Sequence, residues 1–472
     1  MSKGFLVKKI FFLIITFSCC IFGIQAQANI LISKQISAAD LVPNVGVAVY
    51  DIEKQKLVLG INELSLYTPA SLQKIITAVF VLNKLKRGYT ATTKIYKNKQ
   101  GDIFIQFSGD PKFSLKHLKT LLKSFQGQSV GKVCLVDTSY QLPLLSPGWT
   151  IAATQLCYGA LTTKSSIGGN RLVAYVTAGK IGKPAQIKFK KGQVNYPIIN
   201  QTVTKKLCYT DPSVGWMDQM QRDNIDMTRK GLVIKGCVPH DFKNFKVCLP
   251  IKPDDIDYYL KKAVGQAFDE SKVLIKKGIF RACNMPAGAV LISSVESPLL
   301  IDMIKDSLKD SDNFVTDSLF KAAVDIDESK FPANWSFAGK VVRKELNHLM
   351  GLTFTDKDLK IEDGSGLSMY NRVSAKALSQ LLAKMHQKDS GFYKMLPRAG
   401  TDGTLTDRLK SVKGKIWAKT GTLNGINTLA GYIVKNGHPK YSFAIMINGP
   451  TDQLTRNKNL IDQIVRSLTD SF

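Results

Sequence analysis

Histidine and acidic side chains are scarce in this chain of 472 residues. The sequence has five His and 37 Asp plus Glu, against 65 Lys plus Arg. Few histidines, together with cysteine spacings that match no zinc motif, argue against a metal centre. Nothing in the sequence indicates an organic cofactor either. We therefore expect the protein to work without metal or cofactor.

Long apolar runs are also lacking beyond the N-terminus. Lysines there precede an apolar run from Ile10 to Ile24, and Ala26-Gln27-Ala28 follows with small residues at the −3 and −1 positions. This pattern predicts a cleavable signal peptide over residues 1–28 and hence a periplasmic protein. An uncleaved anchor is the alternative, but the run falls short of the about 20 apolar residues that a spanning helix needs.

The charge balance is strongly basic, with a formal net charge of +28. A basic exported protein is attracted to anionic surfaces, so we expect cell-wall peptides as partners and allow peripheral association with a membrane or wall surface. Nucleic acid is the usual rival partner for such a charge. The lysines are spread along the chain and export argues against that role, so we expect no nucleic acid.

Six of the eight cysteines follow residue 28. Export makes disulfides possible, and six cysteines allow fifteen full pairings among which the sequence does not choose. We expect about one to three structural disulfides, with free buried thiols as the alternative. The six are Cys134, Cys157, Cys208, Cys237, Cys248 and Cys283.

The two ends of the mature chain show strand and helix patterns. Strands are predicted over 44–51 and 56–60 near the N-terminus, and over 431–434 and 441–447 near the C-terminus. Residues 454–468 have apolar side chains at helical spacing. The polar face of this last helix is not massed with lysine, so we expect it to pack on the sheet rather than on a membrane.

A first motif lies where a long apolar helix is predicted to begin. Thr68 is a favourable N-cap and Pro69 suits the first helical position, which places Ser71 in the first turn. Lys74 follows three residues later on the same helix face, where its amine can reach the serine hydroxyl. The alternative is an ordinary helix N-terminus with a solvated lysine, because S-x-x-K alone is a weak motif.

Two later motifs favour a catalytic serine–lysine pair over an ordinary helix N-terminus. Ser311-Asp312-Asn313 lies between two helical patterns, and Lys419-Thr420-Gly421-Thr422 follows a strand-like segment. Between them, residues 363–367 form a glycine-rich loop. S-x-x-K, S-D-N and K-T-G in this order resemble the signature of penicillin-recognising serine enzymes, which include penicillin-binding proteins and class A β-lactamases.

The spacing and further segments narrow the resemblance. The interval between Ser71 and Ser311 exceeds what a compact β-lactamase holds, and the chain also carries Gly109-Asp110-Pro111, Pro147-Gly148-Trp149 and a segment over 399–405. Nearly the whole mature chain resembles the D-alanyl-D-alanine carboxypeptidase/endopeptidase family of the penicillin-binding protein 4 type, peptidase family S13.

The resemblance implies an α/β (α+β) fold: a penicillin-binding transpeptidase-like, β-lactamase-like domain with an antiparallel sheet and helices, plus nested inserted domains. We expect the catalytic domain over residues 29–92 and 288–472. An inserted α/β domain is expected over 93–169 and 251–287, and a small mainly-β domain nested in it over 170–250.

The roles expected at the catalytic positions follow from the motifs and the resemblance. Ser71 attacks the carbonyl between two D-alanines and forms an acyl-enzyme. Lys74 takes the serine proton. For this its pKa must be lowered so that its amine is neutral, and we expect the nearby cation Lys419 to contribute to lowering it. Ser311 relays a proton to the leaving amine, and Asn313 hydrogen-bonds the substrate backbone.

Binding roles fall on the third motif. Lys419, Thr420 and Thr422 offer a charge and two hydroxyls for the carboxylate of the peptide or of a penicillin. Gly421 is expected to let the substrate backbone lie against the strand. The backbone N–H groups of Ser71 and Thr422 are expected to form the oxyanion hole.

One stretch departs from the family pattern. Family members often carry an acidic residue after the Pro-Gly-Trp segment, where it contacts the amine of a diaminopimelate side chain, but residues 149–154 contain none. Two rival functions stay open: a β-lactamase, for which no motif identifies the glutamate that would activate a deacylating water, and a non-catalytic module that binds cell wall or lactams.

Overall fold

The computed structural model describes residues 27–40, 44–136, 139–208, 225–228, 231–281, 283–326 and 333–472. The predicted signal peptide lies outside these residues, apart from Gln27 and Ala28, which begin a helix spanning 27–38. None of the helices in these ranges is long and apolar enough to cross a membrane.

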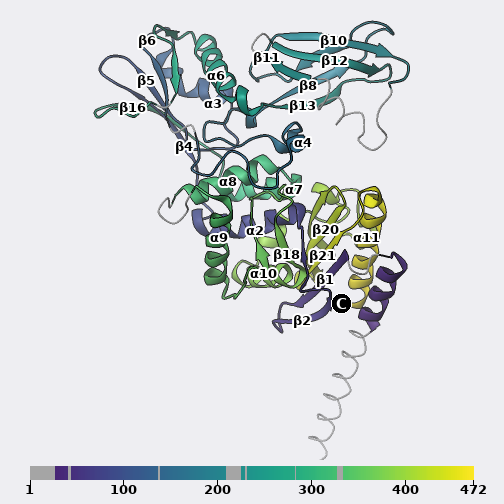
Figure 1. Ribbon diagram of the computed structural model, residues 1–472. Helices are drawn as coiled ribbons and strands as arrows, with labels where there is room; N and C mark the ends of the chain where they lie inside the picture. The colour runs from purple at the N-terminus through teal and green to yellow at the C-terminus, as the bar shows by residue number, and fades with distance from the viewer. Residues whose placement is uncertain are drawn as a thin grey trace, which may run out of the picture.

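A five-stranded antiparallel sheet joins the two ends of the described chain (Figure 1). Strand β1 pairs along its whole length with β21, so that Val45 lies opposite Ile447. The predicted strands near both ends are therefore confirmed. In spatial order the strands are β19 (Ile416–Leu423), β20 (Ile426–Lys435), β21 (His438–Asn448), β1 (Val45–Asp51) and β2 (Lys56–Ile61).

Helices cover both faces of this sheet. On one face, α11 (Leu454–Ser471) and the 27–38 helix bury apolar side chains in one core with the strands, which includes Ile464, Val47 and Leu429. The expectation that the C-terminal helix packs on the sheet is confirmed. The other face carries a second apolar core with α2 (Gln73–Leu85), α7 (Leu300–Asp310), α8 (Asn313–Asp325), α9 (Trp335–Met350) and α10 (Ala375–Lys388).

Short elements complete this part of the chain. They are a three-stranded sheet of β17 (Leu359–Lys360), β18 (Arg372–Ser374) and β3 (Leu66–Tyr67), and the 3₁₀ turns η2 (Ala70–Leu72), η7 (Phe392–Met395), η8 (Gly403–Leu405), η9 (Lys410–Val412) and η10 (Thr451–Gln453).

A second five-stranded sheet lies in the segment between the first two motifs. Its order is β15 (Ile279–Arg281), β7 (Val133–Val136), β5 (Ile103–Gln106), β4 (Thr92–Lys97) and β16 (Val290–Glu296), with α3 (Leu115–Leu121) and α6 (Ile256–Glu270) packed on it. The catalytic part expected over residues 288–472 includes β16. This strand pairs with β4 instead, Glu296 opposite Thr92, so it belongs with the insert.

Residues 171–250 add two three-stranded sheets, ordered β10-β12-β11 and β13-β8-β9. Buried side chains of β8, such as Leu172, join one apolar core with Val264 of α6. The strands are β8 (Arg171–Thr177), β9 (Gln186–Phe189), β10 (Ile198–Lys205), β11 (Ile225–Thr228), β12 (Gly231–Pro239) and β13 (Phe245–Pro250). The segment between the first two motifs also contains a two-stranded sheet of β6 (Ser129–Val130) and β14 (Leu274–Ile275), the short helix α4 (Ile151–Thr154) and the 3₁₀ turns η3 (Lys123–Phe125), η4 (Cys157–Gly159), η5 (Gly168–Asn170) and η6 (Pro253–Asp255).

The six cysteines form three disulfides, which confirms the expectation of structural bridges. The pairs are Cys134–Cys283, Cys157–Cys248 and Cys208–Cys237.

Candidate active site

The first motif forms a tight turn before α2 rather than a simple helix start. Ser71 lies in the 3₁₀ turn η2, whose N-cap is Pro69 without a side-chain cap. The expected cap by Thr68 is wrong, because its hydroxyl accepts a hydrogen bond from Arg372 Nη1 at 2.8 Å. Ala70 has φ of 48°, a left-handed conformation that costs energy for a residue with a Cβ and is typical of functional sites.

Lys74 and Ser71 are paired as expected. Lys74 Nζ donates to Ser71 Oγ at 3.0 Å, to Asn313 Oδ1 at 2.5 Å and to the carbonyl of Ser365 at 2.7 Å. The lysine side chain is buried, whereas Ser71 lines an open cavity. Three acceptors around one amine hold it at the nucleophile, so Lys74 is placed to exchange a proton with Ser71.

Burial governs the protonation of Lys74. Removal from water lowers the pKa of Lys74 to about 8, although the carboxylates of Asp317, Asp363 and Asp312 raise it. The positive charges of Lys74 and Lys419 repel each other, and this repulsion adds to burial in lowering the pKa of Lys419. The effect of Lys419 on Lys74 stays a prediction.

The second motif joins two helices and faces the first. Ser311 ends α7 in a left-handed conformation, Asp312 caps α8 by accepting from Val315 N, and Asn313 is the first residue of α8. Lys419 Nζ donates to Ser311 Oγ at 2.9 Å. The site therefore contains two serine–lysine pairs, and the serine of each pair lines the same cavity.

The third motif runs along the edge strand β19. Thr420 Oγ1 donates a hydrogen bond to Thr404 Oγ1 at 2.7 Å, while Thr422 is exposed and lines the cavity. Gly421 has a packing role, and the substrate role expected for it stays a prediction. A Cβ there would lie 2.2 Å from Thr428 Oγ1 and 3.0 Å from Ser71 N, so this glycine lets the nucleophile turn pack on the strand.

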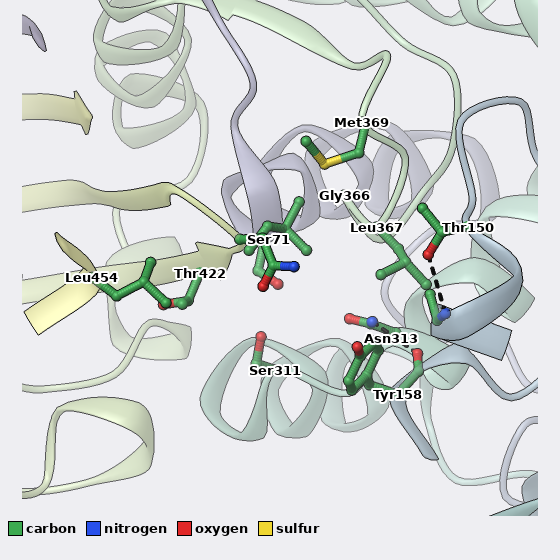
Figure 2. Close-up of a pocket in the computed structure, with 13 residues that line it drawn as sticks. Ser71, Thr150, Tyr158, Ser311, Asn313, Gly366, Leu367, Met369, Thr422 and Leu454 are labelled. Carbon is green, nitrogen blue, oxygen red and sulfur yellow. Dashed lines mark hydrogen bonds between the residues drawn. The ribbon is translucent and has the colours of Figure 1, made fainter. Parts of the chain in front are cut away.

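These groups surround a cavity of about 390 Å³. Figure 2 shows Ser71, Ser311 and Asn313 around its centre, with Thr422 and Leu454 at one end. The described residues that line it are Ser71, Thr150, Ala153, Tyr158, Ser311, Asn313, Gly366, Leu367, Met369, Thr422, Leu423, Asn424 and Leu454. Within the described ranges, no group of His, Cys, Asp and Glu is arranged to hold a metal ion.

Residues 28–471 match the family model described as the D-Ala-D-Ala carboxypeptidase 3 (S13) family. The chain belongs to this family. The S13 relative D-alanyl-D-alanine carboxypeptidase DacB of Haemophilus influenzae is 26% identical over 453 residues, 91% of this chain and 90% of the relative. Penicillin-sensitive carboxypeptidase A of Dictyostelium discoideum is 23% identical over 87% of this chain and 84% of its own length.

The fold agrees with this assignment. The crystal structure of penicillin-binding protein 4 from Haemophilus influenzae matches with a TM-score of 0.76 at 22% identity, over 93% of this chain and 99% of that one. The family and the fold class expected from the sequence motifs are thereby confirmed, and the chain is a serine-type D-Ala-D-Ala carboxypeptidase.

None of the described residues on the wall of this S13 cavity carries a carboxylate. Thr150 and Ala153 from the stretch over 149–154 line it, and none of the described lining residues is acidic. Trp149 points elsewhere, since its Nε1 donates to Asp363 Oδ2 at 2.8 Å. The sequence lacks the acidic residue that family members often carry after the Pro-Gly-Trp segment, and the described cavity wall lacks a carboxylate as well.

Two acidic residues belong to this S13 site although the sequence motifs did not predict them as site residues. Asp317, buried one turn along α8 from Asn313, accepts from Gly364 N at 3.0 Å. Asp363 accepts from Gly366 N at 2.7 Å and from Ser368 N at 2.6 Å, which shapes the loop that offers the Ser365 carbonyl to Lys74. The four-residue spacing of Asn313 and Asp317 on one helix face was the available signal.

Proposed function

We propose that this S13 enzyme hydrolyses peptidoglycan stem peptides that end in D-Ala-D-Ala, and peptide cross-links, through an acyl-enzyme on Ser71. The observation that carries the proposal is the pair of serine–lysine contacts, Ser71 with Lys74 and Ser311 with Lys419, whose two serines line one open cavity.

Acylation begins with proton transfer. Neutral Lys74 accepts the hydroxyl proton while Ser71 Oγ bonds to the carbonyl carbon between the two D-alanines. The N–H groups of Ser71 and Thr422 stabilise the oxyanion, typically by ~3 kcal/mol per donor. Ser311 passes a proton to the departing amine, so D-alanine leaves as the C–N bond breaks. Water then hydrolyses the ester.

Residues of the second and third motifs bind the substrate during acylation. Asn313 Nδ2 donates to the Tyr158 carbonyl at 2.9 Å, and its second N–H is available for a backbone carbonyl of the substrate. Lys419, Thr420 and Thr422 receive the terminal carboxylate. A β-lactam carboxylate has the same charge, and the related Haemophilus influenzae protein has been crystallised with a β-lactam, which supports penicillins as acylating inhibitors.

The location follows from the N-terminus and the charge. We assign residues 1–28 as a signal peptide and the mature enzyme to the periplasm, where its substrate lies. The net charge of +28 favours contact with the anionic wall or membrane surface. Peptidoglycan peptides and β-lactams, and not nucleic acid, are its partners in this account.

The decisive test compares the mature native enzyme with Ser71→Ala after incubation with penicillin, by mass spectrometry, and then on a muropeptide ending in D-Ala-D-Ala. We expect a stable adduct on Ser71 and D-alanine release from the native enzyme, and neither from the variant. Rapid penicillin turnover without peptide cleavage would identify a β-lactamase, and neither adduct nor release would identify a binding module.

A further inference from the structure

A second hollow, of about 900 Å³, adjoins the active-site cavity. Tyr158 lines both, and its carbonyl accepts the hydrogen bond from Asn313 Nδ2. Asp312, from the centre of the second motif, also lines the new hollow. Figure 2 shows Tyr158 beside Asn313 on one side of the cavity. A peptide that passes Asn313 therefore meets this hollow next.

The wall of the hollow is the outward face of the β13-β8-β9 sheet. Leu172, Ala174 and Val176 of β8 are buried, so the alternate residues Arg171 and Val173 point away from the core into the hollow. The disulfide Cys157–Cys248 also lines it and ties the Tyr158 segment to β13. The wall is thus held in place by a sheet and a covalent bridge.

The charges on this wall are mostly positive. Arg171 is neutralised, since its guanidinium donates to Asp312 Oδ2 at 2.8 Å. Burial opposes ionisation of Asp312, but the charge of Arg171 and its hydrogen bond outweigh it and lower the pKa of this carboxyl. Lys190, Lys191 and Lys246 are exposed, and none of them forms an ion pair with another described residue. Within the described part of the chain, these three cations face the hollow without a counter-charge.

We infer that this hollow is an extended substrate subsite, in which Lys190, Lys191 and Lys246 bind carboxylates of the peptide on the acyl side of the scissile bond. The inference rests on the proposed function and deepens it. Lysine amines are compact cations that attract carboxylates without fixed geometry, which suits acidic side chains on a flexible peptide. Charges at an exposed rim act mainly on association, so the subsite should act through KM.

The test uses two peptides that end in D-Ala-D-Ala and differ only in carrying glutamate or glutamine two to four residues before the scissile bond. The variant is Lys190→Glu/Lys191→Glu/Lys246→Glu. Its matched control, Lys180→Glu/Lys183→Glu/Lys205→Glu, makes the same charge change at exposed lysines of the same sheet region that do not line the hollow.

We expect the native enzyme and the control to prefer the glutamate peptide by about tenfold in kcat/KM at low salt, through KM, and the variant to lose this preference. The glutamine peptide should be cleaved equally by all three, and added salt should reduce the preference. An unchanged preference in the variant, or an equal loss on both peptides, overturns the subsite. Failure of the native enzyme to release D-alanine from either peptide would instead contradict the proposed function.

Discussion

At the scale of single residues, the site depends on how burial and carboxylates set the protonation of Lys74. Burial lowers the pKa of this lysine to about 8 and Asp317 opposes it. The same surroundings raise the pKa of Asp317 to about 7, mainly through burial. Lys74 can accept the Ser71 proton only when neutral, so its neutral fraction grows as pH rises through about 8.

The rate of acylation by penicillin should therefore rise with pH and level off above about 8. Asp317→Asn keeps an oxygen for Gly364 N but removes the anion that raises the pKa of Lys74. We expect the midpoint of the pH profile to move to lower pH in this variant. Acylation rates measured between about pH 6 and 9.5 test the shift.

Asp325→Asn is the matched control, since Asp325 lies on the same helix but pairs with Lys164 and acts on the pKa of Lys321. Its midpoint should equal that of the native enzyme. A midpoint for Asp317→Asn that stays in place or moves upward would contradict the role assigned to this carboxylate.

Single-residue predictions from sequence succeeded where the chemistry is local. Ser71 and Lys74 are three residues apart, so helix geometry alone predicts their contact. Asp317 and the Ser365 carbonyl reach Lys74 only through tertiary packing, and no local pattern indicates that contact. The extent of burial that lowers the pKa of Lys74 is likewise a property of the folded protein, so no local pattern indicates it.

At the scale of elements, the nucleophile turn η2 packs directly on β19. Thr428 Oγ1 donates to the Pro69 carbonyl at 2.9 Å, which joins the turn to the neighbouring strand β20. Gly421 faces this contact, and its missing side chain leaves the space that the turn occupies. The distance between Ser71 and the backbone of Thr422, the two halves of the expected oxyanion hole, depends on this close approach.

Gly421→Ala should therefore push the turn away from the strand. Overpacking of this kind typically lowers the free energy of unfolding by ~1–3 kcal/mol. We also expect acylation of Ser71 to slow by at least about tenfold, because displaced donors no longer stabilise the oxyanion. Thermal unfolding and penicillin acylation measure the two effects.

Gly88→Ala serves as the control, since a Cβ at Gly88 meets nothing within 4 Å and its backbone is not left-handed. It should leave both quantities near native values. Equal behaviour of the two variants would show that the absence of a side chain at Gly421 is not needed.

The sequence did not predict those features of a strand or helix that depend on a partner elsewhere in the chain. The sequence of β16 predicts a strand but does not name its neighbour, and pairing with β4 places it in the insert. Thr68 is a good N-cap by composition, yet Arg372 takes its hydroxyl and the chain enters α2 through a 3₁₀ turn. The strands of the central sheet were predictable because each carries its own β pattern.

At the scale of the whole molecule, disulfides connect segments that are distant in sequence. Cys157–Cys248 closes a separation of 91 residues and holds the turn that carries Tyr158, whose carbonyl positions Asn313. Cys134–Cys283 closes a separation of 149 residues within the insert and lines neither of the two hollows. Both bridges thus restrain long segments of the unfolded chain, but only Cys157–Cys248 lies next to a residue that contacts Asn313.

Removing either bridge, as Cys157→Ala/Cys248→Ala or Cys134→Ala/Cys283→Ala, should lower the free energy of unfolding by about 2–5 kcal/mol. Peptide cleavage should differ between them. Without Cys157–Cys248 the Tyr158 carbonyl no longer fixes Asn313, and a misplaced substrate contact of this kind should lower kcat/KM by at least about tenfold relative to the other variant. Denaturant unfolding and D-alanine release, measured at a temperature where both variants are folded, test this. Equal kcat/KM in the two variants would mean that the insert supports the catalytic part only through stability.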